Sequence, residues 1–206
     1  MNCKLKRTLD FALAGLGLPF TAPLCFAIAV LVKLTSKGPV FFRQQRAGLQ
    51  GRPITLIKFR TMLEATDSRG DLLPDERRIT PFGHFLRNTS LDELPELMNV
   101  LKGEMSLVGP RPLLLRYLAR YTPQQNRRHE VKPGITGWAQ INGRNALTWE
   151  EKFAMDVWYV EHRSVFLDAK IIFLTAWKIL KGEGINQPGR ATADEFMGPP
   201  PLGFGG

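Results

Sequence analysis

The longest apolar stretch of the chain lies near its N-terminus. Residues Phe11 to Val32 form a run of 22 positions without a charged side chain. At the rise of an α-helix this run is roughly 33 Å long, enough to cross the hydrocarbon core of a bilayer. A straight transmembrane helix is the simplest interpretation. A signal peptide is a second one, but no A-x-A-like site precedes a polar start, and a basic stretch follows.

Two features of this run favour a helix that enters and leaves the membrane by the same face. Pro19 and Pro23 each remove a helical hydrogen bond and bend the axis. Basic residues flank both ends, and positive flanks prefer the cytoplasmic side. We therefore predict a re-entrant helical hairpin, in which Thr21 could bond to backbone freed by a proline.

The next apolar pattern alternates and predicts a β-hairpin. Strands are expected over Val40–Arg46 and Ile54–Arg60, joined by a turn from Gly48 to Pro53. In the second strand Lys58 and Arg60 share one face. That face is either solvated or directed at a phosphate.

A third pattern places two adjacent carboxylates at the start of a helix. Asp92 and Glu93 are followed by Pro95 and by apolar residues at helical spacing to Leu101, and Arg87 precedes them. A helix N-terminus with a nearby arginine suits an anion such as a phosphate. The simpler explanation, which these residues alone favour, is a capping box of Ser90 with Glu93.

The second half of the chain alternates turn signals with short apolar segments. Two prolines bracket Arg111, so this loop either presents a guanidinium to a phosphate or nucleobase or is a plain connector. The last amphipathic helix, capped by Asp168, suits a membrane interface or an ordinary core equally well. Along the chain the patterns predict helices over 81–87, 113–121, 124–130, 149–160 and 169–180, and a short strand over 138–141.

Composition and charge narrow the class of partner. The formal charge is +9, and residues 1–46 carry seven basic side chains against Asp10 alone. Because this charge surrounds the apolar run, it favours membrane lipids over nucleic acid. The two cysteines and three histidines have no metal-ligand spacing, and no nucleotide-binding glycine loop is present. Carboxylates and basic residues are left as the chemical groups.

Six short motifs in a fixed order resemble the bacterial sugar transferases, also called monotopic phosphoglycosyl transferases. The resemblance extends from about residue 4 to residue 197, and the compact length and the tail at 191–196 resemble the small PglC-type members. The motifs are Lys58–Met62, Ser90–Pro95, Asn99–Gly103, Gly109–Pro112, Lys132–Gly137 and Asn142–Asn145.

The resemblance implies a reaction and a set of site residues. Such enzymes move a sugar 1-phosphate from a UDP-sugar, here an N-acetylated amino sugar, to polyprenyl (undecaprenyl) phosphate and release UMP. Asp92 would be the nucleophile that forms an aspartyl-phosphosugar, with Glu93 assisting. The cofactor would be Mg²⁺, held by Glu93 and Asp168. Substrate-binding residues would be Lys58, Arg60, Arg87, Arg111, Arg144 and Asn145.

The family also bends its membrane helix at a Ser-Pro pair, which corresponds here to Ala22-Pro23, so Thr21 would replace the missing hydroxyl. The expected fold is helix-rich α+β, with a re-entrant membrane helix hairpin, small β-elements and amphipathic interfacial helices. We expect a membrane-inserted part (1–37), a catalytic part (38–185) on the cytoplasmic face of the bacterial inner membrane, and an extended or disordered tail (186–206). The rival interpretations are direct transfer without the covalent intermediate and a non-enzymatic, membrane-anchored anion-binding module.

Overall fold

A computed structural model describes residues 2–36, 38–143, 146–181 and 195–198. It is a helix-rich α+β fold with two small two-stranded sheets. The helices are α1 (Cys3–Thr35), α2 (Asp75–Arg78), α3 (Pro81–Asn88), α4 (Leu97–Lys102), α5 (Pro123–Asn126), α6 (Trp138–Ile141), α7 (Trp149–His162) and α8 (Val165–Lys181). The strands are β1 (Phe41–Ala47), β2 (Pro53–Phe59), β3 (Ser106–Val108) and β4 (Gly134–Thr136), and 3₁₀ turns η1 to η4 span Leu49–Gly51, Leu91–Glu96, Leu115–Arg120 and Arg127–Glu130.

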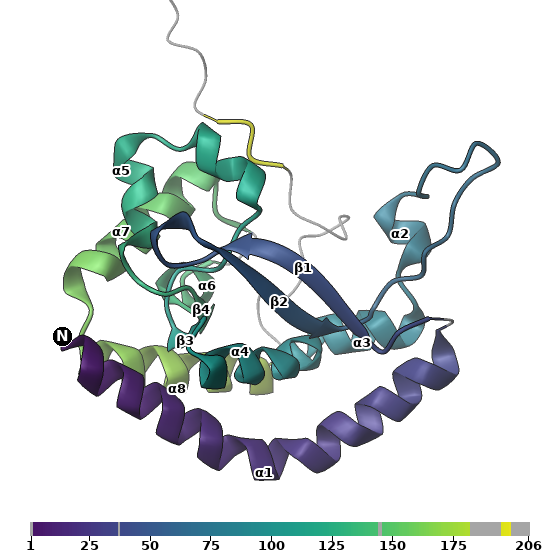
Figure 1. Cartoon of the computed structure of the whole chain (residues 1–206), viewed down its shortest axis with the longest axis horizontal. Coiled ribbons are helices and arrows are strands. Elements are labelled where there is room, and N and C mark those ends of the chain that lie inside the picture. Colours follow the sequence, from purple (N-terminus) through teal and green to yellow (C-terminus); the bar gives the residue numbers. More distant parts are fainter. Residues whose placement is uncertain (1, 37, 144–145, 182–194, 199–206) are drawn as a thin grey trace, which may run out of the picture.

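Helix α1 is a single bowed helix whose two ends lie on the same side of the bow (Figure 1). The structure does not confirm the predicted re-entrant hairpin, because residues Cys3–Thr35 form one continuous helix. Pro19 and Pro23 lie inside the helix, and the Thr21 hydroxyl donates to the carbonyls of Gly17 at 3.1 Å and Leu18 at 3.2 Å. The two prolines leave other carbonyls without an amide donor, namely those of Gly15 and Pro19, four residues before each proline. The helix curves along its length and remains continuous from Cys3 to Thr35.

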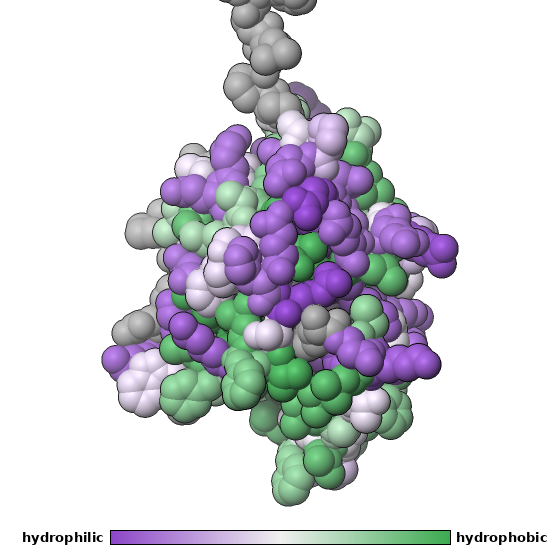
Figure 2. Space-filling model, turned by 90° about the vertical axis from the view of Figure 1, so that its left-hand side faces the viewer, coloured by the Kyte–Doolittle hydropathy of each residue, from purple (hydrophilic) through white to green (hydrophobic). Residues whose placement is uncertain are grey.

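Helix α1 packs against the rest of the fold at two separate places, one in each of its halves. Ala14 packs with Leu56 and Val100 in one buried cluster, and Ile28 packs with Phe59 and Leu86 in another. Between these contacts large apolar side chains are exposed, such as Phe20 at 83%. By length and composition, α1 is the one helix of the described residues that could cross a membrane. Figure 2 shows apolar surface gathered at the α1 end of the molecule and polar surface above it.

Several flanking charges of α1 are used inside the fold. Lys6 pairs with Asp168 of α8 at 2.6 Å, and Asp10 accepts a hydrogen bond from the Leu107 amide. Arg7 donates to the carbonyls of Val100 and Leu101 at the end of α4, where helix carbonyls lack partners. These contacts fix the first half of α1 against α4, β3 and α8.

The β1–β2 hairpin confirms the predicted alternation. Its antiparallel register pairs Phe42 with Lys58, Gln44 with Leu56 and Arg46 with Ile54, and η1 forms the turn. Helices α3 and α7 also lie where the patterns predict them.

Several expected elements differ in the second half. The predicted helix 113–121 is the 3₁₀ turn η3, and the predicted helix 124–130 is α5 followed by η4. The predicted strand 138–141 is wrong: those residues form α6, and the strand is β4, which pairs with β3 in parallel. Helix α8 begins at Val165, so Asp168 lies in its first turn, and the Ser164 hydroxyl caps the helix by accepting from the Leu167 amide. Asp168 is therefore not the N-cap.

The last described segment is anchored and not extended into solvent. Phe196, 2% exposed, packs among Tyr117, Tyr121 and Phe153, and the Glu195 carboxylate pairs with Arg120 at 2.8 Å. The rest of the predicted tail, 186–194 and 199–206, lies outside the described residues.

Candidate active site

The two adjacent acids follow a reversal of the chain. Ser90 has the left-handed conformation (φ 58°, ψ 17°), and the acids then lie in the 3₁₀ turn η2. An N-cap residue has extended backbone, so Ser90 does not cap, and the predicted capping box is wrong. Helix α4 begins only at Leu97, because Pro95 has no amide hydrogen to continue an α-helical ladder through the acids.

Lys58 of β2 joins two carboxylates of η2. Its ammonium lies 2.6 Å from Glu93 and 3.1 Å from Glu96. A 3₁₀ helix has three residues per turn, so Glu93 and Glu96 share one face and meet the same cation. Glu96 is only 2% exposed. Its burial makes the ion pair with Lys58 necessary.

Arg111 is the second cation that binds Glu93. Its guanidinium reaches Glu93 Oε1 at 2.5 Å and Oε2 at 3.4 Å. The Arg111 side chain is 46% exposed, so a phosphate arriving from solvent meets it before the buried acids.

The loop that carries Arg111 is fixed by its backbone. Gly109 donates to the Thr136 carbonyl at 2.9 Å, and Gly134 donates to the Pro110 carbonyl at 3.0 Å. A Cβ on Gly109 would lie 2.4 Å from the Lys132 carbonyl oxygen, so only glycine permits this approach. This explains why the Gly109–Pro112 and Lys132–Gly137 motifs occur together.

A buried ion pair also supports this loop. Arg128 is bound to Asp156 at 2.7 Å, and the same guanidinium donates to the Arg111 carbonyl at 2.7 Å. Both side chains are almost fully buried. The pair therefore fixes the position from which Arg111 extends.

Asp92 differs from its neighbours because its carboxylate is not engaged. It is 8% exposed, and within the described residues it makes no hydrogen bond or ion pair. Burial, and then the negative charge of Glu93, raise the pKa of Asp92 to about 6. Lys58, Arg111 and Arg87 act in the opposite direction. Arg87 itself donates to the Thr61 hydroxyl at 3.0 Å.

The pKa values of Glu93 and Glu96 are shifted in opposite directions. Burial alone would raise the pKa of Glu93, but the charges of Arg111 and Lys58 outweigh it and lower that pKa. Burial raises the pKa of Glu96 to about 7. Neighbouring carboxylates with separated pKa values are typical of sites that bind or transfer charged groups.

The structure brings together five of the predicted site residues, the acids Asp92 and Glu93 with Lys58, Arg87 and Arg111, and places others elsewhere. Lys58, Glu93 and Arg111 are in direct contact, and Arg87 contributes charge to Asp92. Arg60 follows the end of β2 and pairs with Glu64 at 3.1 Å, and within the described residues it makes no ion pair with Asp92 or Glu93.

Asp168 binds Lys6 and the Tyr159 hydroxyl, both at 2.6 Å. Within the described part of the chain it makes no hydrogen bond or ion pair with Asp92 or Glu93. Arg144 and Asn145 lie outside the described residues. Ala22 and Pro23, the predicted kink, are exposed residues within α1, which continues through them as one helix.

The donor set allows only a partial magnesium site. Among the residues that the structure describes, no group of three or more His, Cys, Asp or Glu side chains is arranged to hold a metal ion. Asp92 offers the hard oxygen ligand that Mg²⁺ prefers and is not engaged. Glu93 and Asp168 are each neutralised by cationic side chains. Asp92 can therefore act as a ligand of Mg²⁺ as it stands. Glu93 can do so if Arg111 pairs with a bound anion instead of with Glu93.

Two polar residues of this region were not expected from the sequence. Glu96 contacts Lys58, and the fully buried Asn99 donates to the Thr55 carbonyl at 2.7 Å. The spacing of Glu93 and Glu96 would have indicated a shared face only if a 3₁₀ turn had been expected there.

Comparisons with known proteins agree with the arrangement of these motifs. The family model described as bacterial sugar transferase matches residues 1–182. The chain is 57% identical over 194 residues to "Uncharacterized sugar transferase EpsL" of Bacillus subtilis, covering 94% of this chain and 96% of that protein.

Larger relatives match through part of their length. The chain is 45% identical over 188 residues to the UDP-glucose:undecaprenyl-phosphate glucose-1-phosphate transferase of Escherichia coli, covering 86% of this chain and 40% of that protein. It is 38% identical over 188 residues to the UDP-N-acetylgalactosamine-undecaprenyl-phosphate N-acetylgalactosaminephosphotransferase of Aeromonas hydrophila, covering 87% and 44%. The chain thus spans less than half of these two relatives. On the family match and the B. subtilis relative together, the chain belongs to the bacterial sugar transferase family.

Proposed function

We propose that the protein transfers a sugar 1-phosphate from a UDP-sugar to a polyprenyl phosphate and releases UMP. The observation that carries this proposal is the contrast between Asp92 and Glu93. Glu93 is held by two cations, whereas the Asp92 carboxylate is buried beside them without a hydrogen-bond partner among the described residues. Names of relatives that include undecaprenyl-phosphate as acceptor support the same reaction class.

In the first step an oxygen of Asp92 attacks the phosphorus that bears the sugar. A new P–O bond forms to Asp92, the bond to the UMP phosphate breaks, and UMP leaves with its electron pair. In the second step an oxygen of polyprenyl phosphate attacks the same phosphorus, and Asp92 is released as a carboxylate. Splitting the transfer in two is the general advantage of a covalent nucleophile.

The cations around Asp92 have defined tasks in this scheme. Arg111, which is half-exposed, binds the incoming diphosphate, and Lys58 keeps Glu93 and Glu96 in place. The diphosphate and Asp92 repel each other, and a bound Mg²⁺ would supply the charge neutralisation that lets them meet. We propose Asp92 and Glu93 as its protein ligands, with Asp168 available only if it leaves Lys6.

We propose that the donor is an N-acetylated amino sugar, because the tail at 191–196 resembles the small members of the family. The named relatives act on UDP-glucose and on UDP-N-acetylgalactosamine. A donor panel therefore needs both classes of sugar.

We further propose that α1 lies in the inner leaflet of the bacterial inner membrane. The unsupported apolar middle of the bow would enter lipid, while both basic ends stay at the cytoplasmic surface. Exposed apolar side chains of α8, among them Phe166 and Phe173, would lie at the same interface. Helix α8 also buries Ile171, so it serves the core as well.

The test is UMP release by the purified full chain across a panel of UDP-sugars with undecaprenyl phosphate and Mg²⁺. Asp92→Asn is expected to lower the rate at least a thousandfold, because the nucleophile is lost. Withholding the acceptor should leave a phosphosugar adduct on Asp92, detected by mass spectrometry. Sequential kinetics without an adduct would favour direct transfer. No UMP from any donor would favour a membrane-anchored anion-binding module.

A further inference from the structure

Arg46 lies on the same face of the β-hairpin as Lys58. Directly paired residues of an antiparallel ladder point to the same side, and the register pairs Lys58 with Phe42 and Arg46 with Ile54. Side chains alternate along a strand, so Phe42, Gln44 and Arg46 share that side. Ile54 and Leu56 on this face pack against the cluster that contains Val100 of α4. Arg46 therefore projects over the same side of the sheet as the cation that binds the acids.

The guanidinium of Arg46 has few partners for its degree of burial. One Nη donates to the Gln44 amide oxygen at 2.5 Å, while the buried Nε has no hydrogen-bond partner. Within the described residues Arg46 makes no ion pair. Arg128, by comparison, is paired with Asp156 and hydrogen-bonded to a carbonyl. A desolvated guanidinium without a carboxylate is costly unless an anion joins it.

Arg46 also lies beside the loop that carries Arg111. The Arg46 backbone forms a bridge with Leu114, and the Ala47 amide donates to the Leu113 carbonyl at 2.9 Å. Burial, and then the positive charge of Arg111, lower the pKa of Arg46 to about 10. Two guanidiniums that repel each other in this way both gain from one shared anion.

We propose that Arg46 is a phosphate-binding residue that works with Arg111. The inference rests on the proposed function and deepens it by adding a residue to the substrate site. Its ligand is a phosphate group, either of the donor diphosphate or of the prenyl phosphate acceptor. Planar guanidiniums bind phosphate oxygens through two parallel hydrogen bonds, which would satisfy the free Nε.

The experiment measures binding to the full chain in detergent with Mg²⁺, so that it does not depend on turnover. The probes are UDP for the donor and farnesyl phosphate for the acceptor. The variants are Arg46→Gln, which removes the charge, and Arg46→Lys, which keeps it. The matched control is Arg43→Gln, which makes the same change on the same strand, where the exposed side chain points to the opposite face.

Arg46→Gln is expected to weaken one probe at least tenfold, and Arg43→Gln to leave both within twofold of the original chain. Loss of UDP affinity assigns Arg46 to the donor, and loss of farnesyl phosphate affinity assigns it to the acceptor. Arg46→Lys should recover part of the loss, since an ammonium also attracts phosphate but cannot form the two parallel hydrogen bonds of a guanidinium.

Three results would overturn the proposal. They are binding of both probes within twofold in Arg46→Gln, equal losses in the Gln and Lys variants, which would indicate a packing role, and failure of the original chain to bind either probe. If the chain binds UDP through Arg46 but releases no UMP from any UDP-sugar, the reaction is wrong and the Arg46 site stands.

Discussion

Asp92 and Glu93 are adjacent in the chain but have opposite electrostatic surroundings. Glu93 is bound by Lys58 at 2.6 Å and by Arg111, and its pKa is lowered, whereas the pKa of Asp92 is raised to about 6 by burial and by Glu93 itself. Glu93 is thus fixed by two cations, whereas Asp92, the proposed nucleophile, makes no ion pair within the described residues.

The raised pKa of Asp92 predicts a pH-dependent gain in stability when its charge is removed. The folded state favours protonated Asp92, so its stabilising contribution is complete below pH 4 and is lost as the pH rises through about 6. Asp92→Asn should therefore raise the free energy of unfolding by about 2 kcal/mol at pH 8. Urea titrations in detergent at pH 4 and pH 8 measure the difference, which should shrink toward the lower pH. A variant less stable than the original chain at pH 8 would contradict this account.

The same pKa predicts the acid limb of the rate profile. In the proposed mechanism Asp92 must be ionised to attack phosphorus, so kcat/KM for the donor should fall below about pH 6. Glu93→Gln removes the neighbouring negative charge and should move this limb to lower pH, even though the maximal rate drops. The measurement is the burst of UMP without acceptor, because the acceptor phosphate titrates in the same range. Arg43→Gln is the control, and a limb that stays in place or moves upward in Glu93→Gln would exclude Asp92 as its origin.

The bowed helix predicts where introduced cysteines are labelled. In inverted inner-membrane vesicles, a membrane-impermeant thiol reagent should label native Cys3 in a Cys25→Ala background. It should also label Pro39→Cys in a chain without the two native cysteines. Cys3 begins α1 and position 39 follows its end, so both should face the cytoplasm, whereas Phe20→Cys should be protected by lipid. Labelling of Cys3 and of position 39 from opposite faces would establish a spanning helix.

The anchored segment at 195–198 predicts a stability effect far from the acids. Phe196 is enclosed by four aromatic rings, with the Phe153 ring centroid at 4.9 Å. Phe196→Ala should lower the free energy of unfolding by about 3 kcal/mol, as expected for a large cavity in a core. Met197→Ala is the control, since Met197 is 74% exposed. Equal stability of the two variants would mean that the segment is not docked in solution.

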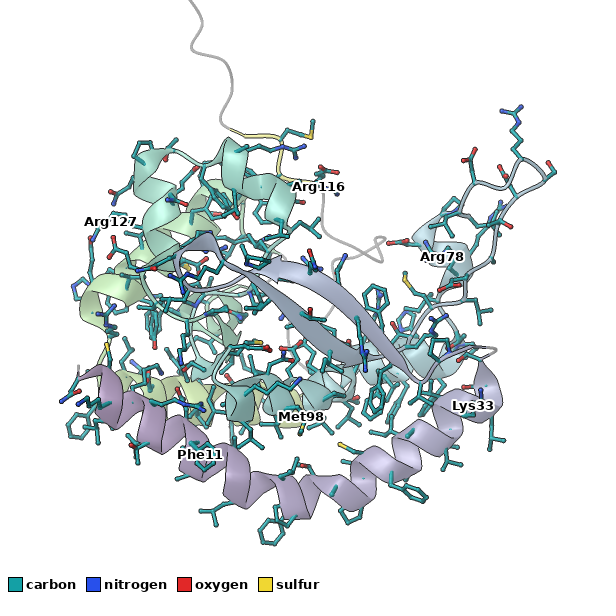
Figure 3. All side chains as sticks on the ribbon, in the orientation of Figure 1. Phe11, Lys33, Arg78, Met98, Arg116 and Arg127 are labelled. Carbon is teal, nitrogen blue, oxygen red and sulfur yellow. The ribbon has the colours of Figure 1, made fainter. Side chains whose placement is uncertain are left out.

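Patterns in the sequence predicted the elements that form between residues close to each other in the chain. The alternation around Lys58 gave the β-hairpin, and helical spacing gave α3 and α7. Asp92, Glu93, Arg87 and Arg111 were found through their residue types and through the family resemblance. Figure 3 shows the side chains between α4 and α1, with Met98 of α4 on the side toward α1, which carries Phe11.

What the sequence did not reveal depends on contacts between distant residues. Lys6 and Arg7 resemble ordinary membrane flanks, but they pair with Asp168 and with the end of α4. Strand β4 exists because Gly109 and Gly134 allow two backbones to touch, which apolar periodicity does not encode. Ser90 matches a capping box by type, and only its left-handed backbone excludes that role.

The reversal at Ser90 makes the length of this connection as important as its residues. In a 3₁₀ turn each added residue rotates those that follow by a third of a turn. One residue inserted between Leu91 and Asp92 would rotate Glu93 and Glu96 off Lys58 and move the Asp92 carboxylate away from Arg87. The solvent-exposed loop around Gly70 carries no such constraint. Natural variation in chain length should therefore accumulate there and be absent between α3 and α4.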